Sequence, residues 1–183
     1  LRYCDPIIDE HTLLIVISQS GETADTIAAM IECKNRGAKT LAIVNVVGST
    51  IANTADHTLY TWAGPEIAVA TTKGYTTQLT LLYLFAIYAA KKIGKIDEEA
   101  YSKLLKELDS LPKKVQEALD MSSAIPELAK KYYKNNSMFL IGRNTDDAVS
   151  LEPALKMKEF SYIHAESYAA GELKHGTIAL IEE

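Results

Sequence analysis

The chain has 183 residues, 48% hydrophobic and 23% charged, with a net charge of −5. These proportions are typical of a globular protein with enough apolar material for a core. The acidic balance and the lack of a Lys/Arg-rich run exclude nucleic-acid binders, which present a basic face. Cys4 and Cys33 have no metal-ligand spacing, so we expect free thiols in a reducing cytoplasm, with a single disulfide as the less favoured alternative.

No segment of the sequence predicts a membrane association. The most apolar run, residues 79–90, is shorter than the ~20 residues of a membrane-spanning helix and is expected to be a buried helix. The first residues lack the pattern of a signal peptide. The chain starts without Met and ends directly after an apolar run, so we expect it to be a piece of a longer protein.

Short apolar runs alternate with amphipathic stretches in the first part of the chain. The predicted elements are a strand at 13–17, a helix at 23–35 closed by Gly37, a strand at 40–46, a helical turn from 48, a strand at 57–62 and a long helix at 71–93. Strands that alternate with helices at this spacing indicate right-handed crossovers and a parallel sheet.

The second part of the chain starts with a charged helical region and then returns to the alternating pattern. The predicted elements are two helices across 95–135 interrupted at Pro112 and Pro126, a strand at 137–142, a helix carrying Ala154 to Phe160, a loop with a short helix at 168–176 and a strand at 177–181. Pro153 is compatible with its helix if it falls in the first turn. This order predicts a second α/β unit that stops after its first crossover.

The first candidate site is the loop Ser18-Gln19-Ser20-Gly21-Glu22-Thr23, between a predicted strand and a predicted helix. Ligands of open α/β sheets bind outside the carboxyl ends of the strands, and a helix N-terminus attracts anions. Ser18, Ser20 and Thr23 add hydroxyl donors and Gln19 adds an amide. The loop is therefore either an anion site or a simple helix start with Ser20 as its cap, and the residues alone favour neither.

The second candidate is the segment from Gly64 to Lys73, again between a strand end and a long helix. Its small residues and the hydroxyls of Thr71 and Thr72 could line the same crevice from a neighbouring strand. The alternative is a helix cap at one of these threonines and nothing more.

The third candidate is Lys156 with Glu159, followed by the loop that carries His175. Residues three apart share a helix face, and a carboxylate beside a lysine in a partly closed site is a plausible proton-transfer pair. For an arbitrary helix, a solvated ion pair is the commoner explanation. A loop histidine titrates near neutral pH and suits acid–base work. His164 and His175 lack zinc-motif spacing, so no metal site is predicted.

Four stretches together resemble a known family. They are Ile17-Ser18-Gln19-Ser20-Gly21-Glu22-Thr23-Ala24-Asp25-Thr26, Ala42-Ile43-Val44-Asn45-Val46, Gly64 to Leu79, and Glu159-Phe160-Ser161-Tyr162-Ile163-His164-Ala165-Glu166 through His175-Gly176. In this order they closely resemble the isomerase (SIS) half of the glutamine–fructose-6-phosphate aminotransferases, also called glucosamine-6-phosphate synthases. The resemblance covers nearly the whole chain.

The resemblance implies an α/β fold of the SIS type, in which an αβα sandwich surrounds a parallel sheet. Residues 1–94 would be the first SIS domain without its start, 95–136 a helical connection, and 137–183 the beginning of a second SIS domain. It also implies a site for a hexose phosphate, fructose 6-phosphate or glucosamine 6-phosphate, and no cofactor.

The resemblance also implies roles for single residues. Ser18, Gln19, Ser20 and Thr23 would contact the phosphate and the sugar, and Val69 and Thr71 the sugar. Glu159 matches the base that moves a proton between C1 and C2, and Lys156 an accessory lysine at that step. His175 matches the histidine that opens the sugar ring, supplied by the neighbouring subunit of a homodimer.

Two departures from the family pattern concern the site. The family usually has serine where Thr71 stands and proline where Thr177 follows Gly176. The sequence also holds no glutaminase domain and no match for the lysine that forms a Schiff base. We therefore expect an aminotransferase parent whose isolated 183-residue part is inactive in the full reaction. The alternative is a non-catalytic SIS module that senses sugar phosphates, against which the Lys156–Glu159 pair and the His175 loop argue.

Overall fold

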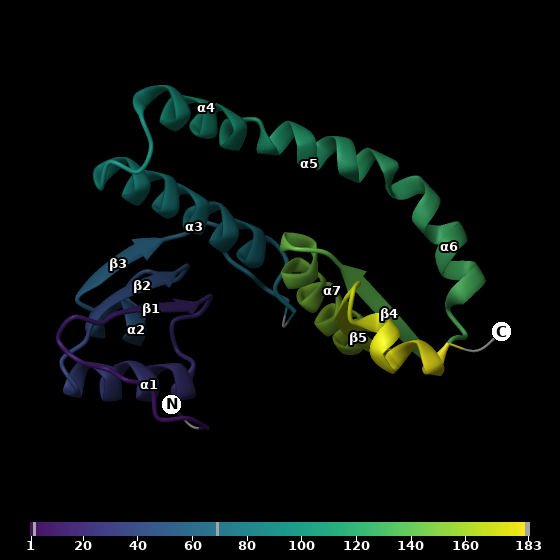
Figure 1. The fold of residues 1–183 in the computed structure, drawn as a ribbon, viewed down its shortest axis with the longest axis horizontal. Helices are drawn as coiled ribbons and strands as arrows, with labels where there is room; N and C mark the ends of the chain where they lie inside the picture. The colour runs from purple at the N-terminus through teal and green to yellow at the C-terminus, as the bar shows by residue number, and fades with distance from the viewer. Residues whose placement is uncertain (2, 69, 182–183) are drawn as a thin grey trace. The chain divides into compact units, whose positions relative to one another are not determined.

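A computed structural model describes residues 1, 3–68 and 70–181 (Figure 1). The chain divides into two compact units, Leu1–Leu111 and Pro112–Glu183, and each unit is described by itself. Within the described residues, no helix combines the length and apolarity that crossing a membrane requires.

Unit 1 holds a parallel sheet with the strand order β1–β2–β3. Leu13 of β1 pairs with Lys39 of β2, and Leu41 of β2 pairs with His57 of β3. Parallel strands place their carboxyl ends at one edge of the sheet, so the segments that follow the three strands are neighbours. The elements of the unit are β1 (Leu13–Ser18), α1 (Ala24–Asn35), β2 (Lys39–Val44), α2 (Thr50–Thr54), β3 (His57–Tyr60), α3 (Lys73–Lys92) and α4 (Glu98–Asp109).

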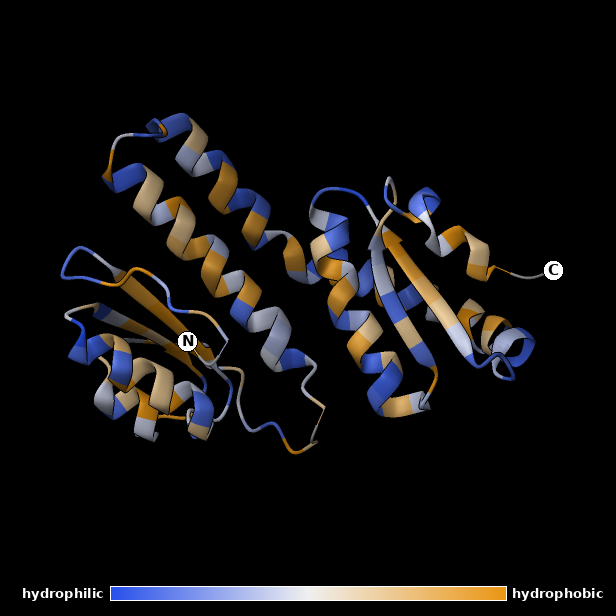
Figure 2. Cartoon of the chain, turned by 60° about the horizontal axis from the view of Figure 1, so that its bottom comes forward, coloured by the Kyte–Doolittle hydropathy of each residue, from blue (hydrophilic) through white to orange (hydrophobic). Residues whose placement is uncertain are grey.

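The core of unit 1 lies between the sheet and two helices. Met30 of α1 and Ile51 of α2 pack with Val16, Ala42 and Val44 of the strands. Figure 1 shows α1 and α2 on one side of the sheet and α3 on the other, and Figure 2 shows how hydrophobic the strands are. The predicted αβα layering around a parallel sheet is therefore confirmed for this unit.

Helix α1 ends at Asn35 and is closed by Gly37, as the sequence predicts. The Gly37 N–H donates to the Lys34 carbonyl and the Ala38 N–H to the Cys33 carbonyl, at 2.9 and 3.0 Å. Gly37 has a φ of 99°, a conformation that a residue with a Cβ adopts only with strain. Cys33 is buried and Cys4 exposed, and both are free thiols.

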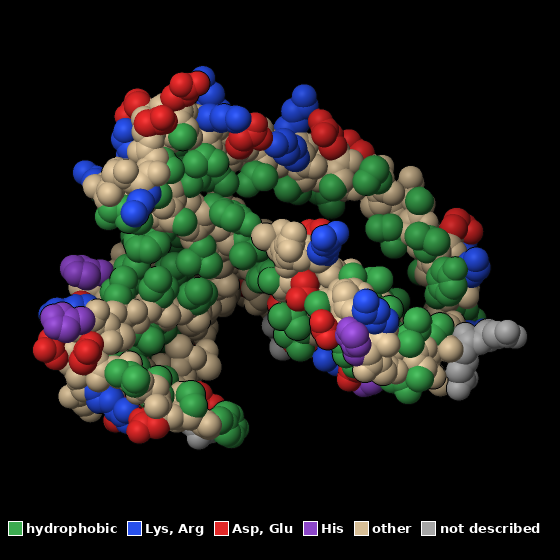
Figure 3. All heavy atoms as spheres, in the orientation of Figure 1, with side chains coloured by type: hydrophobic (Ala, Val, Ile, Leu, Met, Phe, Trp, Pro, Cys, Tyr) green, Lys and Arg blue, Asp and Glu red, His purple; other side chains and the backbone are tan. Residues whose placement is uncertain are grey.

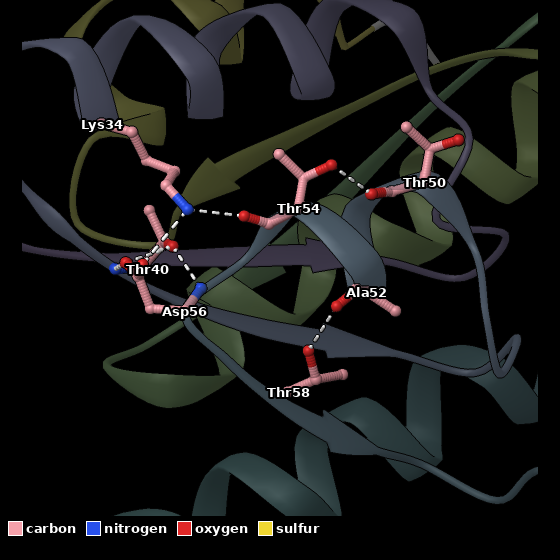
Figure 4. Close-up of polar contacts among 7 residues, drawn as sticks. All are labelled: Lys34, Thr40, Thr50, Ala52, Thr54, Asp56 and Thr58. Carbon is pink, nitrogen blue, oxygen red and sulfur yellow. Dashed lines mark hydrogen bonds and ion pairs between the residues drawn. The ribbon is translucent and has the colours of Figure 1, made fainter.

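A polar network ties α1 to the edge of the core (Figure 4). One carboxylate oxygen of Asp56 accepts both the N–H and the hydroxyl of Thr40, each at 2.8 Å. Lys34 approaches the other oxygen at 3.1 Å and donates to the Thr54 carbonyl at 2.6 Å. These bonds join the last turn of α1, the start of β2 and the end of α2.

The Asp56 network makes the stability of unit 1 depend on pH. The two Thr40 hydrogen bonds and Lys34 lower the pKa of Asp56 from 3.8 to about 2. Between these values the unfolded chain binds more protons than the folded one, so acid favours unfolding. We expect the contribution of Asp56 to be complete above pH 4 and to disappear as the pH falls toward 2.

Urea unfolding of the wild type and of Asp56→Asn at pH 7 and pH 3 measures this contribution. The expected result is a larger loss of unfolding free energy on acidification in the wild type than in the variant. Equal losses in the two proteins would show that the Asp56 carboxylate contributes nothing to acid sensitivity.

Unit 2 contains a two-stranded parallel sheet and the helices that precede and connect its strands. Ser137 of β4 pairs with His164 of β5, and Gly142 with Ala169. The α-helices and strands are α5 (Leu111–Asp120, which begins at the unit boundary), α6 (Ile125–Tyr132), β4 (Ser137–Gly142), α7 (Thr145–Ser161) and β5 (His164–Ala169), with 3-10 helices at Met121–Ala124, Leu173–His175 and Thr177–Leu180.

Three sequence predictions for these segments are wrong or incomplete. The second strand of unit 2 is β5. The predicted strand at 177–181 does not form, and Thr177–Leu180 is a 3-10 helix instead. Pro153 lies inside α7 and not in its first turn. The region predicted as two helices holds α4, α5 and α6, in which Pro112 and Pro126 stand at the second helical position, where a missing N–H leaves no intrahelical bond unmade.

Much apolar surface of unit 1 remains exposed. Leu13, Ile15 and Ile17 alternate along β1 and share one face of that strand, and Tyr83 and Tyr88 of α3 are also exposed. Figure 3 shows hydrophobic side chains gathered over α3 and the strands beside it. The predicted buried helix is therefore only half-buried within the unit.

Candidate functional site

The Ser18 loop, residues 18–23, leads from the end of β1 to the start of α1. Thr23 is the N-cap residue of α1, and its hydroxyl makes no capping hydrogen bond. The Ser20 hydroxyl instead accepts the Glu22 N–H at 3.2 Å, inside the loop. The alternative that Ser20 simply caps the helix is therefore wrong, and the Thr23 hydroxyl is not used as a cap.

The loop holds its hydroxyls in a compact turn. Ser18 Oγ accepts the Gly21 N–H at 3.0 Å and lies 3.5 Å from Thr23 Oγ1. Ser18 is buried, whereas Thr23 is exposed at the helix N-terminus. Hydroxyl groups held at a helix N-terminus, whose first N–H groups carry partial positive charge, form a suitable environment for an anion.

The segment before α3 lies against the Ser18 loop. A Cβ on Gly74 would lie 2.6 Å from Thr71 Cγ2 and 3.3 Å from both Gln19 Cγ and Glu66 Oε2. Gly74, in the first turn of α3, is thus enclosed by Gln19 from one candidate segment and Thr71 from the other. Val69, the remaining predicted contact from this segment, lies outside the described residues.

The start of α3 is capped by a carboxylate. Thr72 is the N-cap residue but its side chain makes no capping bond. Glu66 Oε2 accepts the Gly74 N–H at 3.0 Å instead. The alternative of a threonine cap at this helix is therefore wrong, and the hydroxyls of Thr71 and Thr72 make no cap for α3.

Asn45, just after β2, connects the two candidate segments. Its N–H donates to the Gln19 carbonyl at 3.1 Å. Its side-chain oxygen accepts the Thr61 hydroxyl and the Ala63 N–H, and its amide nitrogen donates to the Gly64 carbonyl at 2.7 Å. Asn45 therefore fixes both the exit from β3 and the middle of the Ser18 loop.

An open hollow of about 260 Å³ adjoins this part of the sheet edge. It is smaller than the roughly 300–1,000 Å³ of pockets that enclose small-molecule ligands. At this sheet edge, unit 1 therefore presents an open hollow and not a closed pocket. The hollow is lined by Asn45, Val46, Trp62, Gly64 and Pro65.

In unit 2, Lys156 and Glu159 form the predicted pair on α7. Lys156 Nζ lies 2.7 Å from Glu159 Oε2 and 3.4 Å from Glu152 Oε1. The hydrogen bond to Glu159 is the main reason that the pKa of Lys156 is raised, so the lysine stays protonated. The Glu159 side chain is 39% exposed, so its carboxylate remains accessible.

His175 ends the 3-10 helix Leu173–His175 and is exposed. Its N–H donates to the Glu172 carbonyl at 2.9 Å, which fixes its backbone. The described residues contain no cluster of three or more His, Cys, Asp and Glu side chains that could hold a metal ion.

Comparison with known proteins decides the family. The pattern of the SIS domain matches residues 2–88 and 131–183. The chain belongs to the SIS domain family. The α/β fold with parallel sheets, predicted from the sequence, is that of its structural neighbours.

Relatives of this SIS chain include aminotransferases that act on fructose 6-phosphate by name. The chain is 56% identical over 182 residues to the glutamine–fructose-6-phosphate aminotransferase (isomerizing) of Clostridium tetani and 54% identical to that of Symbiobacterium thermophilum. These matches cover 100% of the chain but 30% of each relative. The C-terminal domain of glucosamine–fructose-6-phosphate aminotransferase from Francisella tularensis superimposes with a TM-score of 0.95 at 37% identity, over 99% of this chain and 51% of that one. The resemblance found in the sequence is confirmed.

The predicted site residues of the SIS chain fall in both units. Unit 1 brings Ser18, Ser20 and Thr23 together in one loop, with Gln19 beside the Thr71 segment. Unit 2 brings Lys156 and Glu159 together.

Sequence reasoning missed the contacts of three further residues. Glu152 could have been found, because it stands four residues before Lys156 on the same helix. The side chain of Asn45 bonds to residues that lie 16 to 19 positions further along the chain, and that of Glu66 bonds to a residue eight positions further along. Local sequence patterns do not predict such bonds.

Proposed function

We propose that this chain binds a hexose 6-phosphate, with the phosphate at the Ser18 loop. The parent protein would be an isomerizing glutamine–fructose-6-phosphate aminotransferase, which forms glucosamine 6-phosphate. The chain would supply sugar-phosphate binding and the ketose–aldose isomerisation step.

The observation that carries the proposal is the uncapped N-terminus of α1. The Thr23 hydroxyl makes no capping bond, and Ser18 and Ser20 stand in the same loop. The 56% identity to an enzyme named for fructose 6-phosphate supports a hexose phosphate as the anion. Glu159 would accept the proton from the sugar carbon, with Lys156 holding its carboxylate.

Other parts of the proposal concern the sugar, a second subunit and the rest of the parent protein. In a homodimer, His175 of one subunit would open the ring of the sugar that is bound to the other subunit. Val69 and Thr71 would contact the sugar. A glutaminase domain in the parent would supply ammonia. Because the chain spans 30% of its relatives, we propose that it binds ligand but does not perform the overall reaction by itself.

The division of the chain is part of the same proposal. Residues 1–94 and 137–183 would belong to two SIS domains, with 95–136 as a helical connection. The SIS pattern, which matches 2–88 and 131–183 and leaves the residues between them unmatched, supports this division.

Isothermal titration of the chain with glucosamine 6-phosphate tests binding. The expected result is a dissociation constant of roughly millimolar order, as an open edge provides few enclosing contacts. The double variant Ser20→Ala/Thr23→Val is expected to bind at least about tenfold more weakly, because two hydroxyl donors are lost. Thr80→Val, which removes a hydroxyl bonded within α3, is the matched control. If the folded wild-type chain shows no heat of binding at millimolar glucosamine 6-phosphate, the proposal is wrong.

A further inference from the structure

The Ser18 loop is hydrogen-bonded to the first residue of α2. Glu22 Oε1 accepts the Thr50 N–H at 2.8 Å, and Glu22 Oε2 accepts the Thr50 hydroxyl at 2.7 Å. Both carboxylate oxygens are thus bound to one residue that lies 28 positions further along the chain. Figure 4 shows Thr50 at the first turn of α2.

The loop backbone is bound to the same neighbouring segment. The Ile51 N–H donates to the Gly21 carbonyl at 3.0 Å, and the Asn45 N–H donates to the Gln19 carbonyl at 3.1 Å. With the two bonds of Glu22, four hydrogen bonds therefore join the loop to residues 45–51. Two of the four depend on the Glu22 side chain.

Close packing accompanies these bonds. Gly21 has a φ of 70°, and a Cβ there would lie 2.0 Å from Ser49 Oγ. Ser49 is 3% exposed, and its hydroxyl has no hydrogen-bond partner. The Gly21 Cα is thus pressed against Ser49, and the loop has no room to move toward α2.

The charge of Glu22 makes its placement consequential. A carboxylate next to bound phosphate would weaken binding by repulsion between like charges. Here both oxygens accept hydrogen bonds from Thr50, which lowers the pKa of Glu22 and holds the charge at the start of α2. The Glu22 N–H meanwhile donates to Ser20 Oγ at 3.2 Å, so the backbone of Glu22 orients one of the proposed phosphate donors.

We infer that Glu22 is a positioning residue, which by binding Thr50 fixes the Ser18 loop in the form that receives a sugar phosphate. Glu22 does not touch the ligand. It sets the direction of the Ser20 hydroxyl and the entry of the chain into α1 at Thr23. This inference rests on the proposed function of the Ser18 loop.

Titration of variants of the chain with glucosamine 6-phosphate tests the inference. Glu22→Ala removes both hydrogen bonds that the Glu22 carboxylate accepts from Thr50, and Thr50→Val removes the hydroxyl bond. Each variant is expected to bind roughly tenfold more weakly, since a preformed loop is lost. Thr50→Ser keeps the hydroxyl and is expected to bind within about twofold of the wild type. Because Glu22 and Thr50 act as a pair, the double variant is expected to lose no more affinity than the weaker-binding single variant.

Amide hydrogen exchange gives a readout that needs no ligand. In Glu22→Ala we expect faster exchange at the Thr50 and Ile51 amides, with unchanged exchange at Ala42 in β2 as the sign of an intact fold. A purely global loss of stability would accelerate all three amides together.

The outcomes separate the inference from the proposed function. Wild-type affinity in folded Glu22→Ala, or unchanged exchange at Thr50 and Ile51, overturns the positioning role. Absence of binding by the folded wild type overturns the proposed function, while the exchange experiment still decides whether Glu22 fixes the loop. Thr50→Val removes only one hydrogen bond of the contact. If Glu22→Ala does not fold, Thr50→Val takes its place in the binding and exchange measurements.

Discussion

Replacement of Glu159 by Gln in the full-length parent is expected to lower the rate of fructose 6-phosphate isomerisation by about 10²–10⁴-fold, the usual effect of losing a general base. Glutamine keeps the size of the side chain and an oxygen for the bond from Lys156 Nζ, which is 2.7 Å long in the native pair. It cannot accept a proton. Binding of glucosamine 6-phosphate is therefore expected to change by less than about twofold, because the change concerns the proton-transfer step and not ground-state contacts.

The measurement is a coupled assay that converts fructose 6-phosphate to glucose 6-phosphate. Asp146→Asn, which neutralises a carboxylate in the first turn of the same helix, is the matched control and is expected to keep the wild-type rate. A wild-type rate in Glu159→Gln would remove this residue from the mechanism. A full-length protein that binds sugar phosphate but isomerises none would favour the sensing module over the enzyme.

Replacement of Gly21 by Ala is expected to destabilise unit 1 by about 2–5 kcal/mol. Two effects add up at this position. Gly21 has a φ of 70°, which lies in the left-handed region. A residue with a Cβ in this conformation lowers the free energy of unfolding by about 1–2 kcal/mol. The new methyl would also lie 2.0 Å from Ser49 Oγ and 2.5 Å from Ser49 Cβ, and overpacking of this kind costs about 1–3 kcal/mol.

Urea unfolding of two glycine variants separates the two effects. Gly48 has a φ of 75° with no atom within 4 Å of an added Cβ, so Gly48→Ala measures the backbone strain alone. The double variant Gly21→Ala/Ser49→Gly is expected to recover the part caused by overlap. If Gly21→Ala and Gly48→Ala lose equal stability, the packing against Ser49 is looser than the structure describes.

The errors of the sequence analysis have a common physical cause. Residues 177–181 (Thr-Ile-Ala-Leu-Ile) form a short apolar run, and such a run does not distinguish a strand from a helical turn. The actual strand β5 contains His164, Glu166 and Tyr168, and its place beside β4 is set by parallel pairing over its full length. Pairing with a strand more than twenty residues away, and not local composition, decides that these polar residues are extended.

The two helix starts illustrate the same limit. A serine or threonine before a helix predicts a cap, yet Thr23 and Thr72 make no capping bond. At α3 the cap is the carboxylate of Glu66, which accepts a hydrogen bond from the N–H of Gly74, eight residues further along the chain. The sheet edge brings this carboxylate close, so spacing rules for adjacent residues do not find it.

By itself the sequence determined the α/β class, the parallel sheet of unit 1, the Ser18 loop between β1 and α1, and the Lys156–Glu159 pair. All of these follow from periodicity or from neighbours three or four residues apart, which are properties of the local chain. Only the tertiary structure decided that Glu22 binds Thr50, that Asn45 joins two loops, and that Gly21 must lack a side chain beside Ser49. These contacts link residues that are distant in sequence. Only the packing of the strands and helices brings these residues within bonding distance of one another.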